Sequence, residues 1–434
     1  MFRCGKVTKG GIGAVAIFLA SFGDSFSQQA DSVKNQLNLD FEIRPRGEFR
    51  NHFQLTAADS ITPEFFISQR NRLTLGYRSK VFDLVAAFQE IHLWNKSGEP
   101  SSVANVNFFE LYLQPKFGKF SVRLGRQRLL LDNGRIFSDA PWAQQSRSHE
   151  GIRLFYSTKN VVTDFSWMFT RTYSSRYDPM YSPVASHRYV NLVLHHLKAK
   201  LSNQVTLTTV LALDTFENSE KGQNGRYTTG GRIEYLKGKF YLTLNGFYQA
   251  GKTVSGQPIH AYYLQPELRV QVQNTTLRLG SEILSGNDLA KSENTFKSFV
   301  PLYGVAWKFM GNMNFFTRFP GDVNSSGLVN PYIFVLHRIN SKLGIRADWN
   351  IFYNQYPMLN DSKNTVEKYL GNEFDLSLNY RPAAKWEVNF GLSILIPTES
   401  MVLLNKIENT QETPIWSYLM VSYRPSILSG KSIF

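Results

Sequence analysis

Stretches in which apolar and polar residues alternate follow one another along almost the whole of this chain. In FSVRLG, which begins at Phe120, the first, third and fifth residues are apolar, and the others are Ser, Arg and Gly. A period of two places one face of a strand against apolar surroundings and the other against water. About eighteen such stretches occur, and each is close to, or somewhat longer than, the roughly 9–11 residues that a tilted strand needs to cross a bilayer.

The connections between these stretches alternate in length. A few residues form one connection, as at Gly118, Ser202 and Gly238, whereas eight or more form the next, and the longest is 286–329. A soluble sandwich would mix its loop lengths. An even number of strands closes the sheet without a free edge, which lipid could not satisfy. We therefore predict an all-β fold, a transmembrane antiparallel β-barrel of about eighteen strands, with short periplasmic turns and long extracellular loops.

The composition agrees with this fold. Aromatic residues make up 14% of the chain, yet the mean hydropathy is −0.27. Alternating strands combine these properties because every second residue stays polar. A bundle of membrane helices would be far more apolar, and the composition argues against one.

The first residues differ from the rest. Arg3, Lys6 and Lys9 precede an apolar run that ends at Phe22, and small residues follow it. We predict that residues 1–27 are a signal peptide and that 28–434 form a single barrel domain. A transmembrane anchor is the alternative, but it needs a longer run of roughly 17–25 residues. The only cysteine, Cys4, precedes the apolar run, which excludes disulfides and Cys-based sites from the exported chain.

The formal net charge is +14. A basic balance suits nucleic acid, anionic headgroups or an acidic solute as a partner. Exported chains rarely meet nucleic acid, so we expect no nucleic-acid partner.

Several motifs are similar to those of a known family. LGRQ from Leu124 and DNGR from Asp132 precede Trp142 and Arg147, and SEILSG begins at Ser281. With these motifs, about residues 38–424 resemble the alginate-export family of outer-membrane, porin-like barrels. The resemblance implies an eighteen-stranded barrel that passes polysaccharide or small anionic solutes inward or outward. It also implies outer-membrane lipid and the barrel-assembly machinery as partners, and no cofactor.

If the apolar face of each strand meets lipid, charged residues of the other face line the interior. The candidate pore-lining residues are Arg44, Arg46, Arg70, Arg72, Glu90, Glu110, Arg123, Arg153, Arg278 and Glu282. These charges either pair with one another and hold a wide lumen in shape, or create a field along a wet path. Like charges on adjacent strands destabilise a sheet and need a reason, which favours the second interpretation. Both remain open at this point.

The longest loop, Gly286–Val329, carries its own apolar residues. Its candidate constriction residues are Phe296, Tyr303, Trp307 and Phe309. Such a loop either packs on itself or folds inward as a constriction. The sequence alone does not decide whether it plugs a pore.

We therefore expect an outer-membrane channel that passes anionic or sugar-like solutes by passive diffusion through a charged lumen. The alternative is a barrel enzyme or a scaffold whose loops serve binding or adhesion. Ser148 and His149 lie in no recognisable nucleophile elbow, and the sequence has no known metal-binding motif. We expect that the protein is not an enzyme and that it binds no metal and no cofactor. The solute, the direction of transport, the oligomeric state (monomer or oligomer) and the role of the tail 426–434 stay open.

Overall fold

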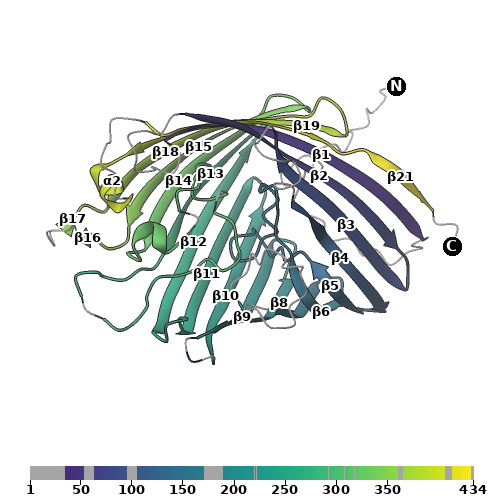
Figure 1. Cartoon of the computed structure of the whole chain (residues 1–434), viewed down its shortest axis with the longest axis horizontal. Helices are drawn as coiled ribbons and strands as arrows, with labels where there is room; N and C mark the ends of the chain where they lie inside the picture. The colour runs from purple at the N-terminus through teal and green to yellow at the C-terminus, as the bar shows by residue number, and fades with distance from the viewer. Residues whose placement is uncertain are drawn as a thin grey trace, which may run out of the picture.

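The computed structural model describes residues 35–52, 63–94, 105–170, 189–218, 220, 222–291, 293–306, 308–316, 318–359, 365–405 and 413–431. Within these residues the chain forms one large antiparallel sheet that closes on itself (Figure 1). The signal peptide expected at 1–27 lies outside the described residues.

The wall of the barrel is built from strands that follow one another in chain order. They are β1 (Gln36–Asn51), β2 (Glu64–Arg78), β3 (Phe82–Leu93), β4 (Asn105–Phe117), β5 (Phe120–Gln127), β6 (His149–Ser157), β7 (Val161–Phe169), β8 (Asn191–Lys200), β9 (Val205–Glu217), β10 (Gln223–Lys237), β11 (Phe240–Lys252), β12 (Pro258–Val272), β13 (Thr275–Leu284), β14 (Leu328–Arg338), β15 (Leu343–Asn354), β18 (Tyr369–Tyr380), β19 (Trp386–Pro397), β20 (Ile415–Tyr423) and β21 (Ser426–Lys431). Because β20 and β21 are two parts of one strand, these nineteen segments form the eighteen-stranded barrel that the sequence predicts.

The barrel closes where β1 meets the end of the chain. β1 pairs with β2 on one side and with β20 and β21 on the other. Pro425 separates the two parts of the last strand, and its backbone oxygen accepts a hydrogen bond of 3.0 Å from the Phe41 amide. The described part of the tail, Ser426–Lys431, thus extends the last strand and covers the edge of β1, a placement that the sequence did not reveal.

Both ends of the described chain lie at the end of the barrel that carries the short turns. Gln36 is opposite Lys431 and also opposite Arg78, which is followed by the short turn to β3. The long connections lie at the other end and hold the minor elements, the β16 (Met358–Leu359) and β17 (Thr365–Val366) pair, η2 (Gly321–Val323) and α2 (Glu399–Asn405). The described part of the chain contains no helix long and apolar enough to span a membrane.

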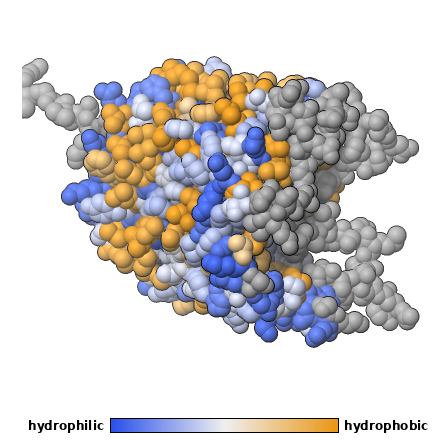
Figure 2. Space-filling model, turned by 90° about the vertical axis from the view of Figure 1, so that its left-hand side faces the viewer, coloured by the Kyte–Doolittle hydropathy of each residue, from blue (hydrophilic) through white to orange (hydrophobic). Residues whose placement is uncertain are grey.

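The outer face of the wall is apolar, as the alternation predicts. Leu73 and Leu75 are 40% and 39% exposed, and Phe88, opposite Leu73 on β3, is 42% exposed. Figure 2 shows hydrophobic residues gathered in broad patches over this outer wall. The polar residues that alternate with these apolar ones face the interior, where Arg70 is buried.

Candidate functional site

Two of the long connections fold into the barrel. Residues 128–148, between β5 and β6, are held by Arg44 on β1, which donates to the Gln144 side chain at 2.8 Å. Residues 285–327, between β13 and β14, are held by β18, which lies three strands from β1 around the wall, where the Met313 amide donates to Glu373 at 2.8 Å. We call these segments the first and second inner loops. β5 is therefore shorter than the stretch that the alternation indicates, because the chain leaves the wall after Gln127.

The two inner loops are joined to each other. Phe137 and Tyr303 form a parallel β-bridge, and the Val305 amide donates to the Gly134 oxygen at 3.1 Å. A Cβ atom at Gly304 would clash with the backbone oxygen of Arg135, so the close approach requires glycine here. Arg147 donates to the backbone oxygens of Tyr303 and Gly304.

The second inner loop both packs on itself and folds inward, so the two alternatives left open by the sequence are not exclusive. Phe299, Phe309 and Phe316 are buried in one apolar core with wall residues such as Leu194 and Phe352. Phe296 packs against this core, and the Tyr303 hydroxyl donates to Asp214 on β9 at 2.8 Å. Trp307, the fourth candidate constriction residue, lies outside the described residues.

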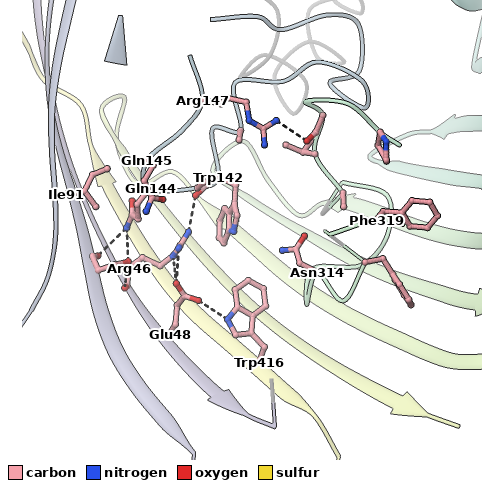
Figure 3. Close-up of a pocket in the computed structure, with 18 of the residues that line it drawn as sticks. Arg46, Glu48, Ile91, Trp142, Gln144, Gln145, Arg147, Asn314, Phe319 and Trp416 are labelled. Carbon is pink, nitrogen blue, oxygen red and sulfur yellow. Dashed lines mark hydrogen bonds and ion pairs between the residues drawn. The ribbon is translucent and has the colours of Figure 1, made fainter. Parts of the chain in front are cut away.

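Between the inner loops and the wall strands β1, β2, β3 and β20 lies a cavity of about 770 Å³ (Figure 3), which we call the vestibule. It lies toward the long-connection end of these strands, because its lining includes Arg50 and Leu93, which lie at that end of β1 and β3. Trp142 from the first inner loop and Phe319 from the second face it, as does Trp416 from β20.

Four arginines line the vestibule, and two of them lie over aromatic rings. The Arg46 guanidinium lies 4.8 Å from the Trp142 ring centre, and that of Arg50 lies 4.6 Å from the Phe66 ring centre. Both arginines also contact Glu48, at 2.8 Å and 3.0 Å. Arg147 and Arg135 are the other two, and Arg135 is paired with Glu282. Glu48 is the single carboxylate of the lining, so the lining carries an excess of positive charge even when Arg135 is left out of the balance.

Candidate pore-lining arginines on β1 and β2 hold the first inner loop. Arg44 is 3% exposed and donates to the backbone oxygens of Pro141 and Ala143 at 2.7 Å and 2.9 Å. Arg70 is also 3% exposed; it pairs with Glu42 and donates to the Ser146 hydroxyl at 2.9 Å.

Arg72 completes this group at the edge of the first inner loop. It donates to Gln89 at 2.7 Å, and its guanidinium lies 3.8 Å from the Phe109 ring centre.

The other candidate pore-lining residues lie mostly on the inner face and are paired with opposite charges. Arg153 pairs with Asp164 at 2.9 Å, and Glu110 pairs with Arg128 at 3.0 Å. The remaining pairs are Arg278 with Glu267 at 2.6 Å and Glu282 with Arg135 at 2.7 Å. Arg123, opposite Arg153 in register, donates to Gln114 at 2.9 Å. Much of the inner charge therefore fits the interpretation of paired groups that hold the lumen in shape.

Glu90 differs from the expectation that it lines the pore. It shares the outer face of β3 with the exposed Phe88, and it lies 2.7 Å from the ring of His92. Gln89, which is 2% exposed, takes the inward position beside Arg72. β3 carries apolar residues on both faces, so its alternation does not fix which face is inward.

The surroundings of two basic side chains on the inner loops shift their pKa values. Burial lowers the pKa of Lys308 to about 8, and the nearby carboxylate of Asp139 offsets only part of this effect. Burial would also lower the pKa of Arg135, but its ion pair with Glu282 raises that pKa above its ordinary value. Lys308 therefore loses its charge just above neutral pH, whereas Arg135 stays charged.

His149, which was considered above as an enzyme residue, and the neighbouring pair His195 and His196 on β8 are engaged in structural contacts. His195 faces outward and bonds Thr163 at 2.9 Å, whereas His196 faces inward beside Asp164 at 3.4 Å. His149 forms a hydrogen bond of 2.8 Å with Tyr189. Among the described residues, no group of three His, Cys, Asp or Glu side chains is arranged to hold a metal ion.

Sequence reasoning missed the partners that complete the site. Trp142 and Arg147 entered only through the family motif, and Gln144 was not considered. Period-two patterns place residues within strands, but they carry no information on how a long connection folds back onto the wall. The high density of polar residues between Leu131 and His149 was the one available signal.

Solved structures share this fold at low sequence identity. OccK5 (OpdH) of Pseudomonas aeruginosa matches 90% of this chain and 98% of its own, with a TM-score of 0.60 and 13% identity. OccAB4 of Acinetobacter baumannii matches 92% and 99%, with a TM-score of 0.62 and 11% identity. OccK2 (OpdF) of Pseudomonas aeruginosa, solved in complex with glucuronate, matches 90% and 97%, with a TM-score of 0.61 and 11% identity.

No curated protein sequence matches the chain significantly. The alginate export family, by contrast, matches residues 35–315. Together with the porin fold, this match supports an outer-membrane channel for solutes and points away from an enzyme. Because the match covers more than half of the sequence, this chain belongs to the alginate export family.

Proposed function

We propose that this protein is a passive outer-membrane channel for small anionic solutes, sugar-like acids among them. The observation that carries the proposal is the vestibule, where Arg46 and Arg50 lie over aromatic rings, Arg147 adds a further positive charge, and Glu48 is the single carboxylate of the lining.

The size of the vestibule favours a small solute. Its volume of about 770 Å³ falls within the roughly 300–1,000 Å³ of sites that hold single small molecules. A polysaccharide in transit would need a continuous wide path, whereas both inner loops lie across this part of the lumen. We therefore favour a monomeric or short sugar acid over a long polymer.

The chemistry of the lining favours an acid with an apolar face. A guanidinium group donates two parallel hydrogen bonds to a carboxylate and keeps its charge at any physiological pH. Trp142 and Trp416 contribute aromatic atoms to the lining, against which the apolar face of a sugar ring can pack. The glucuronate complex of OccK2 is a sugar acid bound to a barrel of the same fold, which supports this choice.

We further propose that the long connections face the cell exterior and the short turns face the periplasm, so that solute meets the vestibule from outside. Export would use the signal peptide at 1–27, and insertion would use the barrel-assembly machinery. Diffusion down a gradient then sets the direction of transport.

Proteoliposome swelling tests the proposal. Liposomes that contain the purified protein are mixed with isosmotic glucuronate, glucose or glucosamine, which differ in charge but little in size. Glucuronate should enter fastest. The differences between the entry rates should become smaller at higher salt, because salt screens the charge of the arginines. Equal rates, or faster entry of glucosamine, would contradict an anion-selective vestibule, whereas no entry of any solute would contradict a channel.

A further inference from the structure

Exposed lysines cluster at the short-turn end of the barrel. They lie in the short connections or at the strand ends beside them, and all are solvent-exposed. They are Lys80, Lys119, Lys159, Lys200, Lys237, Lys239, Lys342 and Lys385. Because the sheet is closed, these residues surround the barrel, and we call them the lysine ring.

The lysine ring is not neutralised locally. All eight short connections lie within the described ranges, and these connections contain no Asp or Glu. Among the described residues, no carboxylate lies within ion-pair distance of a ring lysine. The long connections differ, because there Lys291 pairs with Asp288 at 3.0 Å. The short connections themselves thus carry positive charge only, although carboxylates such as Asp83 and Glu387 lie on the adjoining strand ends, paired with Lys116 and with Arg381 and Arg424.

The lysine ring borders exposed apolar side chains on the outer face. Val81, Phe117 and Phe120 are 68%, 63% and 59% exposed beside the first two turns. Farther round the barrel, the Lys239 ammonium lies 5.4 Å from the ring centre of Phe240. Aromatic and apolar residues in this position mark the edge of the hydrocarbon layer.

The lysine ring differs chemically from the cations of the lumen. Most ion pairs of the inner wall use arginine, as in Arg153–Asp164 and Arg278–Glu267, and Lys116–Asp83 is an exception. Arginine suits bidentate recognition, whereas lysine is a compact charge on a flexible stem that can reach along an apolar surface to a headgroup. Most cations of the inner wall are therefore arginines, whereas the ring consists of lysines.

We propose that the lysine ring binds the headgroups of anionic phospholipids in the leaflet at the short-turn end. The acyl chains would lie on the apolar side chains beside Lys80, Lys119 and Lys239, and the phosphates would meet the ammonium groups. Positive charge in or beside seven of the eight short connections fits a lipid annulus, because a solute approaches the central mouth and an acidic protein would cover only one side. The ring thus orients the barrel and enriches anionic lipid around it.

Electron spin resonance on the full-length protein in phosphatidylcholine bilayers tests this proposal. A trace of spin-labelled phosphatidylglycerol or phosphatidylcholine reports the lipid held at the protein surface. The wild-type protein should prefer phosphatidylglycerol by about threefold or more at 0.1 M salt, since each lysine near an anionic headgroup contributes to binding. At about 1 M salt the preference should largely disappear.

The variants separate charge from structure. One replaces the six turn lysines by Gln: Lys80→Gln, Lys119→Gln, Lys159→Gln, Lys239→Gln, Lys342→Gln and Lys385→Gln. A second replaces the same six by Arg and should keep the preference. A third, Lys252→Gln with Lys291→Gln and Lys297→Gln, changes the opposite end and should also keep it. Conductance in planar bilayers confirms that each variant is folded.

The expected result is loss of the phosphatidylglycerol preference in the six-Gln variant alone. The proposal is overturned if the wild-type protein shows no preference, if the six-Gln variant keeps it, or if the third variant loses it. It is also overturned if the six-Gln variant keeps its lipid preference but loses anion selectivity, because the ring would then steer solutes. If the wild-type protein and all three variants conduct normally, the proposed channel function stands, whether or not the lysine ring binds lipid.

Discussion

Arg44 on β1 and Arg70 on β2 lie directly opposite each other, and both donate to the backbone oxygen of Ala143, at 2.9 Å and 3.3 Å. Two guanidinium groups in this position repel each other, by on the order of 1 kcal/mol in water and more where water is excluded. The carbonyl oxygens of the first inner loop and the carboxylate of Glu42 offset this repulsion. The like charges therefore have a structural use, which is to anchor the loop to the wall.

Removing this anchor should widen the channel. Arg44→Met deletes all the hydrogen bonds from Arg44 to residues 141–144, and a bond from a charged group contributes about 1.5–3 kcal/mol. We expect a larger single-channel conductance and more frequent conductance fluctuations, since the loop would leave the wall more often. Arg123→Met is the matched control, because Arg123 contacts Gln114 in the wall. A variant with unchanged conductance and lower anion selectivity would show that Arg44 acts only through its charge.

The two faces of β2 should differ in their tolerance of substitution. Leu73 is 40% exposed on the outer face, and Leu73→Arg should cost roughly 2–4 kcal/mol of folding free energy if it lies near the bilayer midplane. Arg72→Leu should cost less, since Arg72 contacts Gln89 and Phe109 and has no ion pair among the described residues. Urea unfolding in lipid vesicles measures both. If Arg72→Leu costs more folding free energy than Leu73→Arg, then Arg72 faces lipid and Leu73 faces the interior, and the faces of β2 are assigned the wrong way round.

Which end of the barrel faces the outside of the cell can be tested on whole cells. Cysteines introduced at Ser255 or Ala290, which are exposed positions in long connections, should react with a membrane-impermeant maleimide. Cysteines at Gly118 or Gly238, in short turns, should react only after the outer membrane is permeabilised, because the short turns are expected on the periplasmic side. Labelling of the short turns alone in intact cells would reverse the proposed orientation.

Lys308 should make selectivity depend on pH. Its pKa is lowered to about 8, so it is charged at pH 7 and largely neutral at pH 9. The anion preference should fall across this interval, and Lys308→Met should remove the pH dependence while Lys297→Met, at an exposed position, should not. Because the folded state disfavours the charged form, the contribution of Lys308 to stability should rise with pH between about 8 and its ordinary value of 10.5. A midpoint near 10.5 would mean that Lys308 is exposed to water.

The wall of this barrel could be predicted from sequence, because each strand repeats one local rule. The alternation around Phe120 and Leu73 sets the faces, and the connection lengths set the ends. The exceptions are local: Glu90 lies on a strand that is apolar on both faces, and Ser426–Lys431 follows a proline that hides the continuation of the last strand.

The site could be predicted only in part, because it depends on contacts between distant segments. The arginines of β1 and β2 were found as a group of like charges, but their partners lie about a hundred residues away, as the contact of Arg44 with Gln144 shows. The same holds for Tyr303, whose place depends on Gly304 and Asp214. No periodicity records such contacts.

The reversal potential under a KCl gradient tests the central claim, that the vestibule selects anions, most directly. It is compared between the wild-type protein and the variant with Arg46→Gln, Arg50→Gln and Arg147→Gln, and Arg126→Gln serves as a control because Arg126 pairs with Glu150 on the outer face. The account predicts an anion-selective wild-type channel whose selectivity falls in the triple variant at 0.1 M salt and differs little at 1 M, where the Debye length is only about 3 Å. A wild-type channel without anion preference, or a conducting triple variant with unchanged reversal potential at low salt, would contradict it.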